Sequence, residues 1–281
     1  MIYFSDQELD ALLLEDAPRG DLTSRTLNLS RQPATMSFTR KCPGRVAGID
    51  VAMAMLTKLG LRPKALADDG DDVDAMATLI EVQGPADRLH LGWKSVQVVL
   101  EWSCGVAQYT ADMVAAVQRC NPQAVVACTR KSIPGTRKLA TAAVLAGGGH
   151  IHRAGLSESV LVFTNHRNLL AEGVNASDMV AQLKRQAPEN KIAVEADDLE
   201  DLTTLLPANP DIIQLDKFSL DEVRQAQRLR RQSCSTSTLS VAGGVNRDNA
   251  GDYAETGISL FITSAPYYAA PQDIKVNIRP I

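Results

Sequence analysis

Residues 191–216 have the sequence KIAVEADDLEDLTTLLPANPDIIQLD. This stretch holds two short apolar runs, 191–195 and 211–215, and each ends beside a carboxylate, Glu195 or Asp216. Similar runs recur at 124–128, 158–162, 238–242 and 258–262, and helical segments such as 175–186 and 219–231 separate most of them. Short strands that alternate with helices are typical of βαβ units. The second half of the chain is therefore predicted to form a parallel α/β sheet or a small barrel.

The first hundred residues have a different pattern. Ser5 and Glu8 form a capping-box motif ahead of three leucines, which predicts a short opening helix. The next expected elements are a polar loop over 15–23, a strand over 34–42, a helix over 50–59 and a strand over 77–82. The helical pattern from 85 to 120 is expected to form two helices that meet near Cys104 and Gly105.

The composition excludes several classes of protein and partner. Hydrophobic residues make up 45% of the 281 positions and charged residues 22%, which argues against a disordered or collagen-like chain. A net charge of −4 gives no electrostatic reason to expect nucleic acid or an anionic membrane as partner. The five cysteines form no CxxC pair, which argues against structural zinc and suits a reducing compartment. No basic residue precedes Arg19 and no uncharged stretch could span a bilayer, so a cytoplasmic protein is expected.

Polar and small residues follow the ends of the predicted strands. They are Arg130 and Lys131 after 124–128, Glu195 and Asp216 in the quoted stretch, Gly243 and Gly244 after 238–242, and Ser264 and Ala265 after 258–262. Because the carboxyl ends of parallel strands meet at one edge of a barrel, these residues are expected to converge. Cations and small-residue loops bind phosphate oxygens, and paired carboxylates hold Mg²⁺ that also contacts substrate phosphates. The pattern indicates a sugar phosphate with a pyrophosphate leaving group.

Each of these features also has an ordinary structural explanation. A basic loop such as 129–138 is often only solvated, and a glycine pair is often only a turn, so their convergence is what favours a site. His150 and His152 could share one face as zinc ligands, but no third ligand stands at a suitable spacing. A glycine turn that presents His152 and Arg153 to an anionic ligand is the better interpretation. The sequence has no Walker A motif, no GxGxxG after a strand and no GxSxG elbow, so nucleotide hydrolysis and dinucleotide redox chemistry lose their usual support.

The same residues carry a family resemblance. Residues 129–166, TRKSIPGTRKLATAAVLAGGGHIHRAGLSESVLVFTNH, resemble the signature block of the quinolinate phosphoribosyltransferases, the carboxylating nicotinate-nucleotide pyrophosphorylases. Four further stretches are similar to that family and follow in order: EDAPRGDLT (15–23), VEADDL (194–199), IIQLDKF (212–218) and LSVAGGVNRDN (239–249). The resemblance spans almost the whole chain. The departures from the family pattern resemble one branch in particular, the ModD pyrophosphorylases encoded with molybdate transporters.

The resemblance implies an α/β fold with two domains. An N-terminal α/β sandwich would occupy residues 1–108, and an open α/β barrel of six to seven strands would occupy 109–267. Residues 268–281 would pack back on the N-terminal domain. The resemblance also implies a homodimer in which the N-terminal domain of one subunit covers the barrel mouth of the other, and it leaves assembly into higher oligomers open.

The reaction implied by the resemblance joins a pyridine carboxylate to 5-phosphoribosyl pyrophosphate with Mg²⁺ and releases pyrophosphate; quinolinate also loses CO₂. Carried over by position, Arg130, His152 and Arg153 would contact the carboxylates of the acceptor. Lys131 would contact the donor as a catalytic residue together with Glu195 and Asp216, which would hold Mg²⁺ or the ribose hydroxyls. Gly243, Gly244, Ser264 and Ala265 would cradle the 5-phosphate.

Four departures bear on the acceptor. Lys94 stands where the family has an arginine donated across the dimer, and lysine keeps the charge but loses the bidentate fork. Phe163 stands where the family has a lysine, and Ser240 to Ala242 replace a Glu-x-Ser. Ser264 replaces a glycine of the terminal phosphate loop. Donor binding is therefore expected, quinolinate is disfavoured, and a less charged or more apolar aromatic carboxylate is the expected acceptor.

Two alternatives stay open on the sequence. One is a quinolinate enzyme that forms nicotinate mononucleotide for NAD biosynthesis and compensates elsewhere for the lost cations. The other is a degenerate barrel that binds an anion such as molybdate without catalysis. The retained pair Glu195 and Asp216 argues against the second alternative, because paired carboxylates repel an oxyanion unless a metal intervenes.

Overall fold

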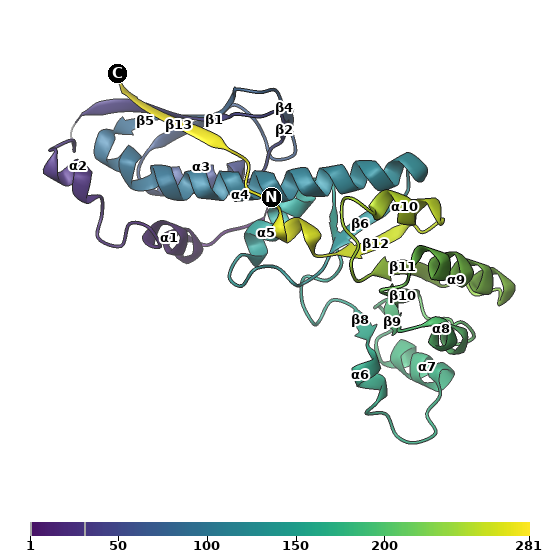
Figure 1. Cartoon of the computed structure of the whole chain (residues 1–281). Helices are drawn as coiled ribbons and strands as arrows, with labels where there is room; N and C mark the ends of the chain where they lie inside the picture. The colour runs from purple at the N-terminus through teal and green to yellow at the C-terminus, as the bar shows by residue number, and fades with distance from the viewer. Residues whose placement is uncertain (1, 31) are drawn as a thin grey trace. The chain divides into compact units, whose positions relative to one another are not determined.

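The computed structural model describes residues 2–30 and 32–281, which form two compact units. The first unit comprises the chain through Ala111, Ile133–Gly148 and Pro266–Ile281, and the second comprises Asp112–Ser132 and Gly149–Ala265. Figure 1 shows an antiparallel sheet with helices in the first unit and a parallel sheet with helices in the second. The predicted α/β class, with a sandwich followed by an open barrel, is confirmed.

The first unit is built on a four-stranded antiparallel sheet. Its strand order is β13 (Ile274–Pro280), β1 (Pro33–Arg40), β5 (Ala77–Pro85) and β3 (Arg62–Ala65). The remaining elements are α1 (Asp6–Leu14), α2 (Leu22–Thr26), α3 (Ile49–Lys58), the small ladder of β2 (Gly44–Arg45) with β4 (Asp72–Val73), α4 (Ala86–Cys120) and α5 (Arg137–Ala146). Ser5 and Glu8 form the expected capping box of α1, whereas the polar loop expected over 15–23 gives way at Leu22 to α2, capped by Asp21.

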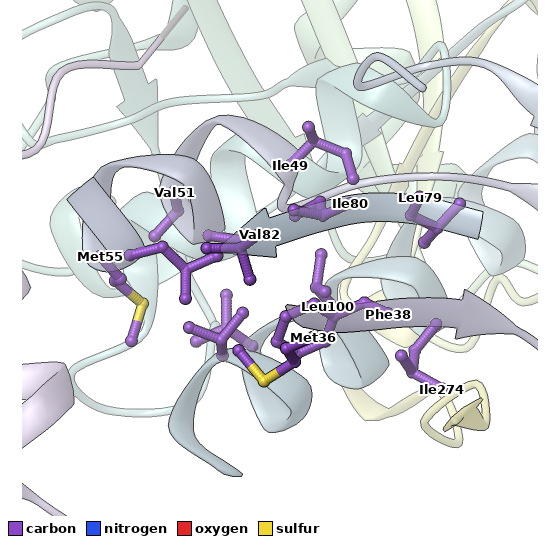
Figure 2. Close-up of a cluster of buried hydrophobic side chains, with 14 of the residues drawn as sticks. Met36, Phe38, Ile49, Val51, Met55, Leu79, Ile80, Val82, Leu100 and Ile274 are labelled. Atoms are coloured by element: carbon purple, nitrogen blue, oxygen red, sulfur yellow. The ribbon is translucent and has the colours of Figure 1, made fainter. Parts of the chain in front are cut away.

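The core of the first unit lies between one face of this sheet and the helices α3 and α4. In Figure 2, side chains from α3 and from strands β1 and β5 point toward one another, among them Met36, Phe38, Met55 and Ile80. These residues alternate along the strands and recur at helical spacing in α3, so both elements bury their apolar faces against the same layer.

The prediction of two helices between 85 and 120 was wrong, because α4 is one helix from Ala86 to Cys120. Gly105 suggested a break but lies inside the helix. The residue is a glycine because the backbone of the C-terminal segment packs against it. A Cβ atom at this position would clash with the carbonyl oxygen of Ala270. The glycine thus marks a close approach of two backbones rather than a helix end.

Gly105→Ala is expected to lower the free energy of unfolding by about 2–3 kcal/mol, because the methyl group would push the segment at Ala270 off the helix. Gly92→Ala in the same helix is the control, since its Cβ would crowd only the flexible end of the Leu59 side chain, 2.5 Å away, and would lie at an ordinary contact distance of 3.8 Å from Leu56 Cδ2. That change should be near neutral, because alanine favours a helix by about 1 kcal/mol over glycine. Urea unfolding of both variants checks the prediction, and equal stability of the two would contradict it.

The second unit is a seven-stranded parallel sheet in the order β7, β6, β12, β11, β10, β9, β8. The strands are β6 (Val125–Cys128), β7 (His150–Ile151), β8 (Val160–Val162), β9 (Ile192–Ala196), β10 (Ile212–Asp216), β11 (Thr238–Ala242) and β12 (Leu260–Thr263). The helices are α6 (Thr164–Arg167), α7 (Ala176–Gln186), α8 (Leu199–Leu205), α9 (Leu220–Gln232) and α10 (Ala250–Glu255), and the 3₁₀ turn η1 (Ala265–Tyr268) follows β12.

The six apolar runs predicted as strands are all present, and β7 is an additional strand. Residues 147–153 were expected to be a glycine turn, but His150 and Ile151 pair with Ala127 and Cys128 of β6. Two residues are too few to show a periodic pattern, so this strand had no signal in the sequence. In the described part of the chain, no helix is long and apolar enough to cross a membrane.

Candidate active site

The carboxyl ends of the parallel strands carry the predicted site residues of the second unit. The positions after or at the ends of the strands are Arg130 and Lys131 (β6), His152 and Arg153 (β7), Glu195 (β9), Asp216 (β10), Gly243 and Gly244 (β11), and Ser264 and Ala265 (β12). Along the sheet, the chemistry therefore changes from cations on β7 and β6, through small residues on β12 and β11, to carboxylates on β10 and β9. The remaining edge strand, β8, is followed directly by Phe163.

Glu195 and Asp216 form an acidic pair on neighbouring strands. Glu195 Oε2 accepts a hydrogen bond from Gln214 Nε2 at 2.7 Å, and Asp216 Oδ2 accepts one from Lys217 Nζ at 2.6 Å. Burial raises the pKa of Glu195, and the nearby charge of Asp216 raises it further. A divalent cation between the two carboxylates would relieve this repulsion.

The acidic pair fits Mg²⁺ held together with a phosphorylated ligand. Among the described residues, no group of three or more His, Cys, Asp or Glu side chains could hold a metal ion. Mg²⁺ is usually bound through one or two carboxylates while substrate phosphates and water complete its octahedron. Glu195 and Asp216 would hold the ion in this way only when phosphate oxygens are also present.

A group of cationic side chains lies toward the opposite edge of the sheet, after β7 and β6. His152 and Arg153 follow β7, and the backbone N–H of His152 donates to Cys128 O at 2.9 Å. Burial lowers the pKa of His152, and the charges of Arg153 and Arg130 lower it further. The pKa of Arg153 is lowered by burial and by Arg130. His152 Nε2 is buried without a hydrogen-bond partner in the described residues. A neutral imidazole beside two arginines is suited to a carboxylate ligand, which would take up the excess positive charge.

The glycine loop after β11 is held in a left-handed conformation. Gly243 and Gly244 have φ angles of +78° and +87°. The side-chain amides of Asn246 and Asn249 donate to Gly244 O at 3.2 and 3.1 Å, which fixes the loop. Such loops let backbone N–H groups approach a phosphate closely.

The loop after β12 is more constrained than the sequence suggested. Ser264 Oγ shares a 2.5 Å hydrogen bond with Thr129 Oγ1, which ties this loop to the end of β6. The N–H of Ala265 donates to Thr263 Oγ1 at 3.0 Å, so in this structure that amide is already engaged. Gly243 and Gly244 are thus the stronger part of the predicted phosphate cradle.

Lys94 lies on α4 in the first unit and is not among the residues that the second unit brings together. Its Nζ donates to Gln97 Oε1 at 2.8 Å and lies 4.4 Å from the centre of the Trp93 ring. Lys94 also lines a pocket of about 430 Å³ within the first unit, together with Leu12, Val98, Trp102 and Ile133.

Phe163 is held in place by its neighbour His166. The two rings stack with centroids 5.7 Å apart, and the Phe163 N–H donates to His166 Nδ1 at 3.0 Å. An aromatic face therefore stands at the end of β8, where the family resemblance implies a lysine.

A network around Arg167 was missed from the sequence. Arg167 donates to both carboxylate oxygens of Asp201, to Thr164 Oγ1 and to the backbone oxygen of Glu195. Thr164 Oγ1 in turn donates to Asp197 Oδ2 at 2.5 Å. These bonds join the ends of β8 and β9 to the first turn of α8, and they support Glu195 through its backbone. No spacing in the sequence pairs these residues, which meet only because β8 and β9 are neighbours in the sheet.

Comparisons with known proteins agree with this arrangement. Residues 106–277 match the quinolinate phosphoribosyl transferase C-terminal domain, and residues 21–104 match the N-terminal domain. The protein named "Putative pyrophosphorylase ModD" of Pasteurella multocida is 59% identical over 279 residues, which cover 99% of each chain. The carboxylating nicotinate-nucleotide pyrophosphorylase of Mycobacterium leprae is 32% identical over 93% of this chain and 94% of its own. The crystal structure of the nicotinate-nucleotide pyrophosphorylase from Ehrlichia chaffeensis superposes with a TM-score of 0.88 at 24% identity, covering 99% of this chain and all of the other. The chain belongs to the quinolinate phosphoribosyltransferase family.

Proposed function

We propose that the chain is a Mg²⁺-dependent phosphoribosyltransferase of the cytoplasm. It transfers phosphoribose from 5-phosphoribosyl pyrophosphate to a pyridine-carboxylate-like acceptor other than quinolinate. One observation carries the proposal: cations, a glycine loop and a carboxylate pair follow one another along a single edge of the parallel sheet. That order suits a ligand with an anionic acceptor, a sugar 5-phosphate and a metal-bound pyrophosphate.

The donor half of the site has the groups that the reaction needs. The ring nitrogen of the acceptor forms a bond to the anomeric carbon, while the bond from that carbon to pyrophosphate breaks and its electron pair leaves with pyrophosphate. Positive charge grows on the ribose ring, and the carboxylates of Glu195 and Asp216 stabilise it. Lys131 neutralises the leaving group from the end of β6. When bound, Mg²⁺ neutralises part of the pyrophosphate charge.

The acceptor half favours a ligand with fewer charges than quinolinate. Arg130 and Arg153 supply the cations at one edge of the sheet, with the neutral imidazole of His152 beside them, enough for one carboxylate. At the other edge, the Phe163 ring offers an apolar face in place of a cation. A flat aromatic monocarboxylate suits this combination of groups, whereas a second carboxylate would lie unpaired where the phenyl ring replaces a cation.

Lys94 enters the proposal through a second copy of the chain. Lys94 belongs to the first unit, whereas the residues at the barrel edge belong to the second. Because the family resemblance implies a cation donated across a dimer at this position, we propose that Lys94 reaches the site of the partner subunit in a homodimer. A homodimer is expected in sedimentation velocity, and Lys94→Ala should weaken acceptor binding without changing the sedimentation coefficient.

Isothermal calorimetry with 5-phosphoribosyl pyrophosphate tests the donor site. Binding by the wild type should require Mg²⁺, and the double variant Glu195→Ala/Asp216→Ala should lose it. Absence of binding by the wild type, with or without Mg²⁺, would overturn the transferase proposal, and molybdate would be the next ligand to titrate.

Acceptor competition tests the second half of the proposal. With donor and Mg²⁺ present, pyridine monocarboxylates should be turned over with a higher kcat/KM than quinolinate. Phe163→Lys should shift this preference toward quinolinate, because it restores a cation where the dianion needs one. Turnover of quinolinate by the wild type with the higher kcat/KM would show that the acceptor is unchanged.

A further inference from the structure

A row of polar side chains crosses the barrel sheet at the level of Glu195. In the parallel register, Glu195 of β9 lies beside Gln214 of β10, and Gln214 lies beside Ser240 of β11. Register neighbours point to the same side of a sheet, so the three side chains share one level. Asp216 follows two residues later on β10 and is one level nearer the open edge. Interior levels of a parallel α/β barrel are usually filled by branched apolar residues, so this row is unusual.

Gln214 is deeply buried and bonded at one end only. It is 4% exposed, and its Nε2 donates to Glu195 Oε2 at 2.7 Å. Its Oε1 has no partner among the described residues, and neither has the Ser240 hydroxyl, which is fully buried. A buried polar atom without a partner is unfavourable, and an apolar side chain of similar size would avoid this cost. The fold alone therefore gives no reason for a glutamine at this level.

The bond to Glu195 has a direction that suits an ionised carboxylate. A side-chain amide can present either a donor or an acceptor. Here the donor faces the Glu195 carboxylate, which can accept but not donate a hydrogen bond when it is ionised. Hydrogen bonds to charged groups are the strong ones, so this contact orients the carboxylate as well as satisfying it. Arg167 meanwhile holds the backbone oxygen of the same residue at 3.1 Å. Glu195 is thus fixed from its side chain and from its main chain by residues that are not predicted to touch the ligands.

We propose that Gln214 is a positioning residue for the donor site: it anchors Glu195 Oε2 and so presents Oε1 to the ribose and to Mg²⁺. The inference rests on the proposed function, because it assigns Glu195 to the bound donor.

Calorimetry with 5-phosphoribosyl pyrophosphate and Mg²⁺ tests the proposal on two variants, Gln214→Leu and Gln214→Met. The methionine side chain is unbranched, like that of glutamine. Each should bind the donor about tenfold or more weakly, the effect expected when a hydrogen bond to a charged group is lost. Their melting temperatures should equal or exceed that of the wild type, because the unpaired amide oxygen is gone. Weaker binding in a chain that is no less stable separates a positioning role from a structural one.

Ser240→Ala is the matched control. It lies on the adjacent strand at the same level, is fully buried, and has no hydrogen bond to Glu195 among the described contacts. It should weaken donor binding far less than Gln214→Leu does, because it removes no contact to Glu195.

A double-mutant cycle with Glu195→Ala makes the test specific. If Gln214 acts through Glu195, Gln214→Leu should have no further effect in the Glu195→Ala background. An equal loss in both backgrounds, or an undiminished affinity of Gln214→Leu alone, would overturn the inference while leaving the transferase proposal intact. Failure of the wild type to bind the donor would instead overturn both.

Discussion

Gly243→Ala is expected to abolish measurable binding of 5-phosphoribosyl pyrophosphate and to lower the free energy of unfolding by about 3 kcal/mol. A Cβ atom at Gly243 would lie 2.6 Å from Lys217 Cγ, 2.7 Å from Asp216 Oδ1 and 3.0 Å from Lys217 N. The Lys217 backbone cannot retreat easily, because its N–H donates to Ala242 O at 2.8 Å. The methyl group therefore displaces the Asp216 carboxylate from the acidic pair.

Gly244→Ala separates this collision from backbone strain. Gly244 also has a positive φ angle, +87°, but a Cβ atom there would meet nothing within 4 Å. Only the left-handed backbone penalises alanine at this position, by about 1–2 kcal/mol. Urea unfolding should thus rank Gly243→Ala well below Gly244→Ala in stability. If the two variants unfolded at the same urea concentration, the contact with Asp216 would not be what makes Gly243 necessary.

The sequence was enough to predict the strands and the edge that they share. Apolar runs such as 191–195 and 211–215 correspond to β9 and β10, because a strand buried on both faces is apolar along its whole length. Once the strands are parallel, the placement of Glu195 and Asp216 at one edge follows from geometry alone.

Contacts that depend on strand order could not be predicted. The hydrogen bond from Gln214 to Glu195 requires β10 beside β9, and the bonds from Arg167 require β8 beside β9. Local patterns also misled, as at Gly105. This residue resembles a helix end because glycine lowers helix propensity, but the glycine makes room for a neighbouring backbone far along the chain.

Arg40 shows that an alternating pattern can predict a buried position correctly even where the residue is charged. The strand predicted over 34–42 places Arg40 on the same face as Met36 and Phe38, and all three are fully buried. The Arg40 guanidinium donates to Cys42 O at 2.9 Å, to Arg45 O at 2.6 Å, and more weakly to the side-chain oxygens of Gln108 and Gln272. These are neutral acceptors from the turn after β1, from β2, from α4 and from the segment before β13.

Arg40→Met is accordingly expected to lower the free energy of unfolding by about 3–5 kcal/mol, the largest stability effect predicted for this chain. Methionine fills much of the space but donates no hydrogen bond, so the Cys42 and Arg45 carbonyls would lose the partner that the buried guanidinium supplies. Arg40→Lys should recover only part of the loss, because an ammonium group cannot reproduce the planar fork that spans separate acceptors.

Lys41→Met provides the comparison within the same strand end. Lys41 pairs with Asp273 at 2.5 Å, but both side chains are about half exposed, and exposed ion pairs contribute about 0–1 kcal/mol. Urea unfolding should therefore show that Arg40→Met lowers the free energy of unfolding severalfold more than Lys41→Met, although the two cations are adjacent. If Arg40→Met unfolded no earlier than Lys41→Met, the acceptors of the guanidinium would have to be satisfied without Arg40. Otherwise the order of the two variants shows that burial, and not charge, makes the guanidinium a structural element that joins β1 to α4 and to the C-terminal segment.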